Sequence, residues 1–127
     1  MSSNLDRQVA ELLGYHAKCI GINAYSNRET WYLMCPDGKP CHDQQAFTEE
    51  EAWEQHVPRY STDLNLAMSL VSGSRLEHLF MLRQFENAWL AAITDETLQR
   101  AQGSFEGRSE IPAKAICLAW LEWHSNQ

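Results

Sequence analysis

The sequence predicts an α+β fold, in which one antiparallel β-sheet is layered with helices in a sandwich-like α/β/α arrangement and residues 1–127 form a single domain. Three observations predict it: amphipathic helical patterns lie near both ends of the chain, β-rich runs stand between strong turn signals, and no repeat or linker divides the chain. With 127 residues, 44% of them apolar, the chain has the size and composition of one ordinary globular domain.

The first elements are a helix and a β-hairpin. We predict a helix over residues 4–13, because its apolar residues fall on one face and Gly14 follows as a terminator. Residues 15–24 and 30–35 favour two strands, which pair back across the polar turn between them. The hairpin is followed by a strong turn, Pro36-Asp37-Gly38-Lys39-Pro40.

The middle of the chain carries two capped helices. Thr48-Glu49-Glu50-Glu51 is a capping box that opens a short helix, and Val57-Pro58 ends this helix. The next helix is predicted to begin at Ser61 or Thr62, since either hydroxyl can accept a hydrogen bond from the following turn. It is predicted to stop at Gly73.

The last third of the chain is predicted to contain two strands, a loop and a helix. Residues 75–94 fit both a helical and an alternating pattern, and we predict two strands with a turn near Phe85-Glu86-Asn87. Residues 95–110 are polar and predict a long loop. Pro112 suits the first turn of a closing helix whose apolar face should pack against a sheet. That face contains Ile116, Ala119, Trp120 and Trp123.

Charge and hydropathy limit the partners and the location. The formal net charge of −7 argues against direct binding to nucleic acid or to an anionic membrane, but it suits a protein partner. No apolar run approaches the roughly 20 residues of a membrane span, and the first residues do not resemble a secretory signal. We therefore expect a cytoplasmic protein whose four cysteines are reduced.

The sharpest candidate for site chemistry is a zinc centre on the predicted hairpin. If the hairpin closes, two groups of soft ligands approach each other and provide a tetrahedral donor set. The candidate ligands are His16, Cys19, Cys35, Cys41 and His42. Against this interpretation, strand alternation points His16 and Cys19 to opposite faces, and the gap between Cys35 and Cys41 is wider than usual for zinc. The alternative is scattered thiols and a surface histidine, with no cofactor.

No motif for catalysis emerges. Ser61, Asp63 and either His56 or His78 are residue types of a catalytic triad, but no G-x-S-x-G elbow surrounds a serine. Cys41-His42 are adjacent, and adjacent side chains diverge, which makes a poor nucleophile–base pair. We expect that the protein is not an enzyme.

The aromatic residues offer candidate binding anchors. Five tryptophans and four tyrosines are a heavy load for this length. Core packing explains most of them, whereas aromatic side chains near helix ends or on strands can anchor a partner or stack on a base. The candidate binding residues are Trp31, Trp53, Tyr60, Asp63 and Trp123.

Three segments, taken in order, resemble the phage ABA sandwich family. They are Leu12-Leu13-Gly14 with the aromatic strand leading to Pro36-Asp37-Gly38, then Val57-Pro58-Arg59-Tyr60-Ser61-Thr62-Asp63, and finally Ala115-Ile116-Cys117-Leu118-Ala119-Trp120-Leu121. The second and third are the more specific. The resemblance implies a small phage or prophage protein with a β-sheet layered between helices, and it supplies no catalytic residues.

The expected function is that of a phage or prophage accessory protein that acts by non-enzymatic binding in the cytoplasm of the host cell. A host protein is the expected partner, and inhibition of a host antiviral-defence protein is the specific form of this hypothesis. Two alternatives remain, a small-ligand or nucleotide-binding module and a zinc-stabilised interaction domain, with a hydrolase last. The sequence leaves the identity of the partner and the formation of a homo-oligomer open.

Overall fold

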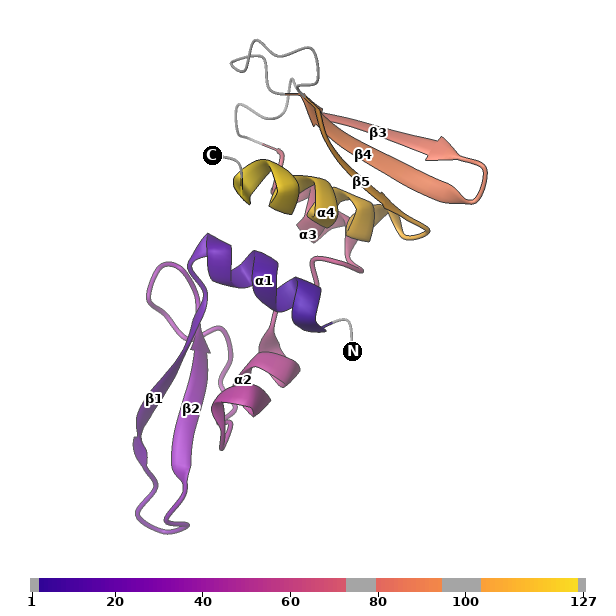
Figure 1. Ribbon diagram of the computed structural model, residues 1–127. Helices are drawn as coiled ribbons and strands as arrows, with labels where there is room; N and C mark the ends of the chain where they lie inside the picture. The colour runs from indigo at the N-terminus through magenta and orange to yellow at the C-terminus, as the bar shows by residue number, and fades with distance from the viewer. Residues whose placement is uncertain (1–2, 73–79, 95–103, 126–127) are drawn as a thin grey trace. The chain divides into compact units, whose positions relative to one another are not determined.

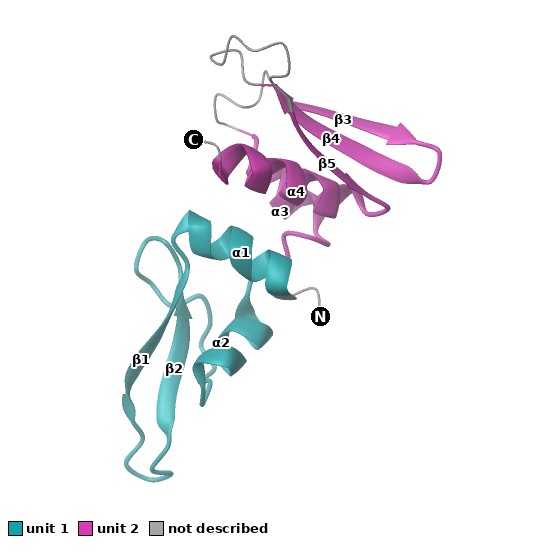
Figure 2. Cartoon of the chain, in the orientation of Figure 1, with its two compact units in different colours: residues 1–58 teal, residues 59–127 magenta. Residues whose placement is uncertain are grey.

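The computed structural model of the chain describes residues 3–72, 80–94 and 104–125. The chain divides into two compact units, residues 1–58 and 59–127 (Figure 2). Each unit combines helices with antiparallel strands (Figure 1), so the predicted α+β class is confirmed. The strands form two sheets, of two and three strands, in place of the one sheet that the sequence predicts. Each sheet pairs strands that are consecutive in the chain, which keeps the connections short.

The first unit is a β-hairpin between two helices. Its elements are α1 (Ser3–Leu13), β1 (His16–Ile22), β2 (Glu29–Met34) and α2 (Glu49–His56). These confirm the predicted helix, hairpin and short helix. Gly14 ends α1 with a φ of 106°, a left-handed conformation that glycine adopts without strain. The hydroxyl of Thr48 accepts a hydrogen bond of 3.1 Å from the N–H of Glu51, so the predicted cap of α2 is also confirmed.

The hairpin has one face toward its own helices. Ala17 and Leu33 pair in the antiparallel register of β1 and β2, and α2 packs against both strands. Leu33 is completely buried, in a cluster with Ala10, Trp53 and Val57. Because side chains alternate along a strand, the neighbouring residues of the hairpin face the other way.

The second unit is a three-stranded sheet with helices. Its elements are α3 (Leu64–Ser69), β3 (Phe80–Phe85), β4 (Ala88–Thr94), β5 (Ser104–Ser109) and α4 (Pro112–Ser125). β4 lies between β3 and β5 and is antiparallel to both (Figure 1). α4 packs against β4 and β5, as predicted for the closing helix, and the turn between β3 and β4 lies at Glu86-Asn87.

Gly107 marks the closest approach of β5 to α4. A Cβ atom at this position would lie 2.3 Å from the carbonyl oxygen of Ala115 and 2.6 Å from the amide nitrogen of Ala119. Both atoms are backbone, which cannot move aside as the end of a side chain can. The strand and the helix therefore pack this closely only because residue 107 has no side chain.

Two predicted details are wrong. Residues 104–109 of the predicted loop form β5, because pairing with the central strand β4 outweighs their low β-propensity. The cap of α3 is Asp63, whose carboxylate accepts hydrogen bonds from the N–H groups of Asn65 and Leu66, and not Ser61 or Thr62. Gly73, residues 75–79, His78 and residues 95–103, which also carried predictions, lie outside the described residues.

Among the helices of the described ranges, none combines the length and the apolar character needed to cross a bilayer.

Candidate functional site

The five predicted zinc ligands do not gather into one site. Within residues 3–72, 80–94 and 104–125, no three His, Cys, Asp or Glu residues form a group that could hold a metal ion. Cys19 lies opposite Trp31 in the hairpin, whereas His16 lies opposite Met34 at its other end. The Nδ1 atom of His16 is 3.3 Å from the carbonyl oxygen of Gly14. The alternation of the strand therefore separates these two residues, as the sequence argument against zinc anticipates.

Cys35 and Cys41 do come together, at a shorter distance than two ligands of one zinc ion take. Their Sγ atoms are 2.6 Å apart. Two thiolates bound to one zinc ion, with bonds of about 2.3 Å at a tetrahedral angle, would stand roughly 3.8 Å apart. The two sulfur atoms thus contact each other directly.

His42 is held by its backbone surroundings. The N–H of Leu33 donates to its Nε2 at 3.0 Å, and its Nδ1 lies 2.6 Å from the carbonyl oxygen of Gln44. Nδ1 therefore carries the proton and donates, while Nε2 accepts. With both ring nitrogens engaged, His42 fixes the loop after β2 against the strand and is not free to bind a metal.

The ring of His42 lies in a stack of three. The ring of Tyr32 stacks on the ring of His42 with a centroid distance of 5.4 Å. The ring of His56, the last residue of α2, also stacks on that of His42, with a centroid distance of 3.4 Å. The Nε2 atom of His56 is buried and has no hydrogen-bond partner among the described residues. Burial lowers the pKa of His56, and His42 lowers it further, while Glu51 acts in the opposite direction. The stack therefore favours a neutral imidazole at position 56.

Three of the five predicted binding residues are buried or engaged in local structure. Trp53 and Tyr60 are buried, and the guanidinium of Arg7 lies 4.8 Å from the ring centroid of Trp53. Asp63 is engaged as the cap of α3.

The remaining two candidates, Trp31 and Trp123, are half-buried in different units. The indole N–H of Trp31 donates to Glu29 at 2.9 Å, and Trp123 makes an edge contact with the ring of His124. The aromatic residues chosen from the sequence thus serve mainly in packing and local bonding.

Two neighbouring pockets open instead on the β1–β2 hairpin. One, of about 420 Å³, includes Lys18, Tyr32 and His42 in its lining, and the other, of about 340 Å³, includes Tyr25 and Thr30. Ile20 lines both pockets. The side chain of Ile20 is therefore the element that the two pockets share.

The position of Ile20 results from a β-bulge. Cys19 pairs with Trp31 and Gly21 pairs with Thr30, so Ile20 has no partner residue on β2. An extra residue of this kind bends the strand and redirects the side chain. Gly21 follows with a φ of 141°, a conformation that side chains rarely adopt, so the sequence Ile20-Gly21 is well suited to the bulge.

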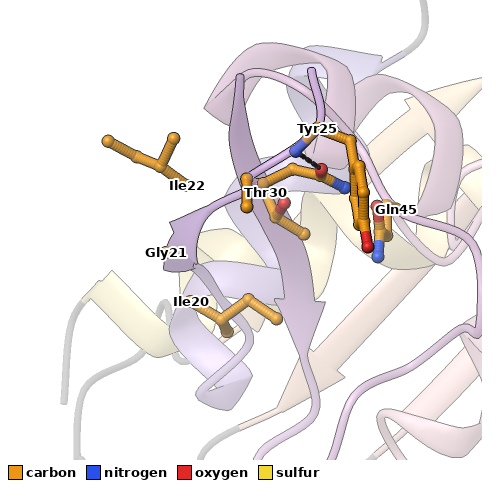
Figure 3. A pocket seen from close by; sticks show the side chains of 8 residues that line it. Ile20, Gly21, Ile22, Tyr25, Thr30 and Gln45 are labelled. Atoms are coloured by element: carbon orange, nitrogen blue, oxygen red, sulfur yellow. Dashed lines mark hydrogen bonds between the residues drawn. The ribbon is translucent and has the colours of Figure 1, made fainter. Parts of the chain in front are cut away.

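Tyr25, in the loop between β1 and β2, lines the smaller pocket. The side-chain oxygen of Asn23 accepts hydrogen bonds from the N–H groups of Tyr25 at 2.8 Å and Ser26 at 3.3 Å. Figure 3 shows the ring of Tyr25 beside the side chain of Gln45, with Ile20 and Thr30 on the adjoining strands. The side chain of Tyr25 is fully exposed, with a relative accessibility of 101%.

The free edge of β1 adjoins these pockets. β1 pairs with β2 on one side, and no other strand pairs with it within the described ranges. The outer edge of β2, by contrast, is bridged by Ala46 and Pro40. Ile20 and Ile22 on β1 are 56% and 67% exposed, so the unpaired edge also carries exposed apolar side chains.

We name this region the hairpin surface and define it as Lys18, Ile20, Ile22, Tyr25 and Tyr32. The sequence analysis did not select it, although a glycine inside a strand pattern is a known signal for a bulge. The alternation of side chains along β1 predicts which residues share a face of the hairpin. Only the pairing register with β2 shows that Ile20 has no partner residue.

Comparison with known proteins adds no relative: no family model, curated protein or solved structure matches the chain. The likeness to the phage ABA sandwich family thus stays a prediction from the three sequence segments.

Proposed function

We propose that the protein acts by binding another protein, without catalysis, and that the hairpin surface is the binding site. The observation that supports this most is the coincidence of exposed apolar side chains with an unpaired strand edge on β1. Isolated exposed apolar residues are normal on a protein surface. Ile20, Ile22 and Tyr25 are close in the chain, however, and all three line one pocket.

An extended segment of the partner suits this surface. The unpaired N–H and C=O groups of β1 can form a ladder with an added strand, and this mode of recognition takes its affinity from main-chain bonds. Alternate side chains of such a segment would enter the pockets on either side of Ile20. Lys18 and Asp43 at the larger pocket provide charges of both signs for orientation.

The partner that we propose is a host protein, with the chain acting as a phage or prophage accessory factor. The small size, the net charge of −7 and the resemblance to the phage ABA sandwich family support this proposal. A component of host antiviral defence is the partner to test first, since inhibition by binding requires no catalytic residues in the inhibitor.

The test is capture from host lysate with a photo-crosslinking residue placed at Ile20. A crosslinker at Met81 of the second unit is the matched control, because Met81 is also an exposed apolar residue on a strand, at 43%. We expect one stoichiometric partner that is crosslinked from position 20 and not from position 81. Ile20→Asp should then reduce the recovery of that partner at least about tenfold, as expected for a residue central to an interface.

Two results would contradict the proposal in different ways. A partner whose recovery is unchanged by Ile20→Asp would show that binding occurs elsewhere on the protein. The absence of any stoichiometric partner would argue against the binding function itself. Circular dichroism of Ile20→Asp must match that of the original protein, which is expected because Ile20 is exposed.

A small-ligand module is the second candidate, and one observation favours it. The pocket of about 420 Å³ presents the ring of Tyr32, the ring of His42 and the ammonium of Lys18 together, which suits a flat anionic ligand. A nucleotide that bound there would raise the melting temperature of the native protein, and Lys18→Ala should remove that rise. Screening nucleotides by thermal shift separates this candidate from the protein-binding proposal.

A further inference from the structure

We propose that Cys35 and Cys41 form a redox site that closes to an intramolecular disulfide when a small-molecule disulfide, such as oxidised glutathione, is present. The proposal rests on the geometry of the loop between them and is independent of the hairpin surface as a binding site. The two thiols are free in this structure, with Sγ atoms 2.6 Å apart. This separation lies between the length of a disulfide bond, about 2.05 Å, and the roughly 3.6 Å at which unbonded sulfur atoms pack.

The backbone holds both cysteines in place. The N–H of Cys35 donates to the carbonyl of Lys39 at 2.8 Å, and the N–H of Cys41 donates to that of Leu33 at 2.9 Å. Between them, the N–H of Gly38 donates to Cys35 at 2.9 Å, which closes the turn. The S–S bond of a disulfide is about 2.05 Å long, so the two sulfur atoms already lie close to the bonding distance while both thiols are free.

The chemical step balances as two thiol–disulfide exchanges. The sulfur of one cysteine attacks oxidised glutathione, forms a mixed disulfide and releases one glutathione thiolate. The second cysteine then attacks the sulfur of the first and releases the second glutathione. The protein loses two protons and two electrons, and one oxidised glutathione becomes two reduced molecules.

The surroundings assign a role to each cysteine. Burial raises the pKa of Cys41, and its hydrogen bond with Cys35, the charge of Cys35 and the charge of Asp37 also raise it, together to about 12. A thiol with a raised pKa is a poor nucleophile at neutral pH, because the thiolate is the attacking form. We therefore assign the first attack to Cys35, and Cys41 resolves the mixed disulfide.

The other two cysteines provide internal controls. Cys19 is exposed, and its Sγ lies 3.8 Å from the carbonyl oxygen of Gly21. Cys117 is buried in α4. Under the same oxidant Cys19 has no thiol neighbour in the hairpin and should stop at the mixed disulfide, while Cys117 should stay unmodified.

Peptide mass measurement tests the proposal without any substitution. The native protein is incubated with oxidised glutathione, the remaining thiols are blocked with N-ethylmaleimide, and the unfolded chain is digested with trypsin. Because Lys39 is followed by Pro40, trypsin leaves residues 29–59 as one peptide with both cysteines. We expect this peptide to lose the mass of two hydrogen atoms and to regain it with dithiothreitol. Blocked thiols or glutathione adducts in this peptide, while the peptide of Cys19 carries glutathione, would overturn the proposal.

Two serine variants test the assigned roles. In Cys41→Ser, residue 35 should accumulate as the glutathione adduct, since no resolving thiol remains. In Cys35→Ser, residue 41 should be modified at least about tenfold more slowly than residue 35 in the first variant, because burial raises the pKa of the Cys41 thiol. Equal rates in the two variants would contradict the assignment of roles. The peptide masses of the original protein test the disulfide itself even if a variant fails to fold.

Discussion

The two units use antiparallel strands in opposite ways. In the second unit, β4 is paired on both edges and four consecutive residues, Leu90 to Ile93, are buried. In the first unit, every residue of β1 except Ala17 is exposed, and one edge of the strand has no partner among the described residues. The comparison teaches that the same ladder gives a core when both its edges and both its faces are covered, and an exposed edge that is open to pairing when they are not.

The largest expected effect concerns the close packing of the second unit. Gly107→Ala places a Cβ atom against the backbone of α4, 2.3 Å from the carbonyl oxygen of Ala115, so the helix must move away from the sheet. We expect a loss of about 3 kcal/mol in the free energy of unfolding, at the upper end for overpacking. Chemical denaturation followed by circular dichroism measures it.

The matched control for Gly107 lies in the first unit. A Cβ atom at Gly38 would meet nothing within 4 Å, so Gly38→Ala adds only the strain of a φ of 88°. That strain should cost about 1 kcal/mol. If both substitutions lowered the free energy of unfolding equally, the effect at Gly107 would come from backbone strain or glycine loss in general. The close packing of β5 on α4 would then not be its cause.

A smaller effect is expected at the start of α3. Asp63→Ala removes an acceptor for the N–H groups of Asn65, at 3.0 Å, and Leu66, at 3.2 Å. The expected loss is about 1 kcal/mol, typical of a helix cap. Thr62→Ala is the control, because Thr62 is exposed and is not the cap. If both variants lost the same free energy of unfolding, Thr62 would contribute to the helix cap as the sequence predicts.

The smallest expected effect is a pH dependence in the first unit. The pKa of His56 is lowered in the folded protein, chiefly by burial, so the unfolded chain binds a proton more readily. Stability should therefore be full above the ordinary histidine value of about 6.5 and fall as the pH drops below it. His42, stacked on the ring, and Glu51, which opposes the shift, are the charged groups that act on it.

His56→Phe tests this dependence while keeping a ring in the stack. Unfolding curves at pH 8 and pH 5 should differ less for the variant than for the original protein. A difference of the same size in both proteins would assign the acid sensitivity to other groups.

The fold was accessible from the sequence wherever local signals and packing agree. Gly14 at the end of α1, the Thr48 cap of α2 and the apolar face of α4 are set by local signals, and the structure contains all three. The carboxylate of Glu51 accepts from the N–H of Phe47, so the second bond of the predicted capping box is shifted by one residue. β5 was missed because its pairing with β4 is a tertiary effect. The polar sequence of residues 104–109 carries no strand pattern that predicts this pairing. Asp63 was missed because three neighbouring residues could each cap a helix, and only the backbone geometry decides among them.

The candidate site was less accessible, since it depends on register. Cys35 and Cys41 were selected as metal ligands from their residue types, and the loop geometry places their sulfur atoms against each other instead. Trp53 was selected for its position near a helix end, where it is buried beneath Arg7. Ile20 was passed over because an aliphatic residue in a strand pattern gives no signal until the skipped pair is known.

The bulge at Ile20 also bears on how regular the free edge of β1 is. A flat, regular edge with exposed isoleucines would serve as a template for an identical edge, and copies of the chain would stack into fibres. One unpaired residue and the left-handed backbone of Gly21 interrupt that regularity halfway along β1. The bulge therefore breaks the regular edge beside the exposed isoleucines, and an irregular edge of this kind is a poorer template for an identical strand.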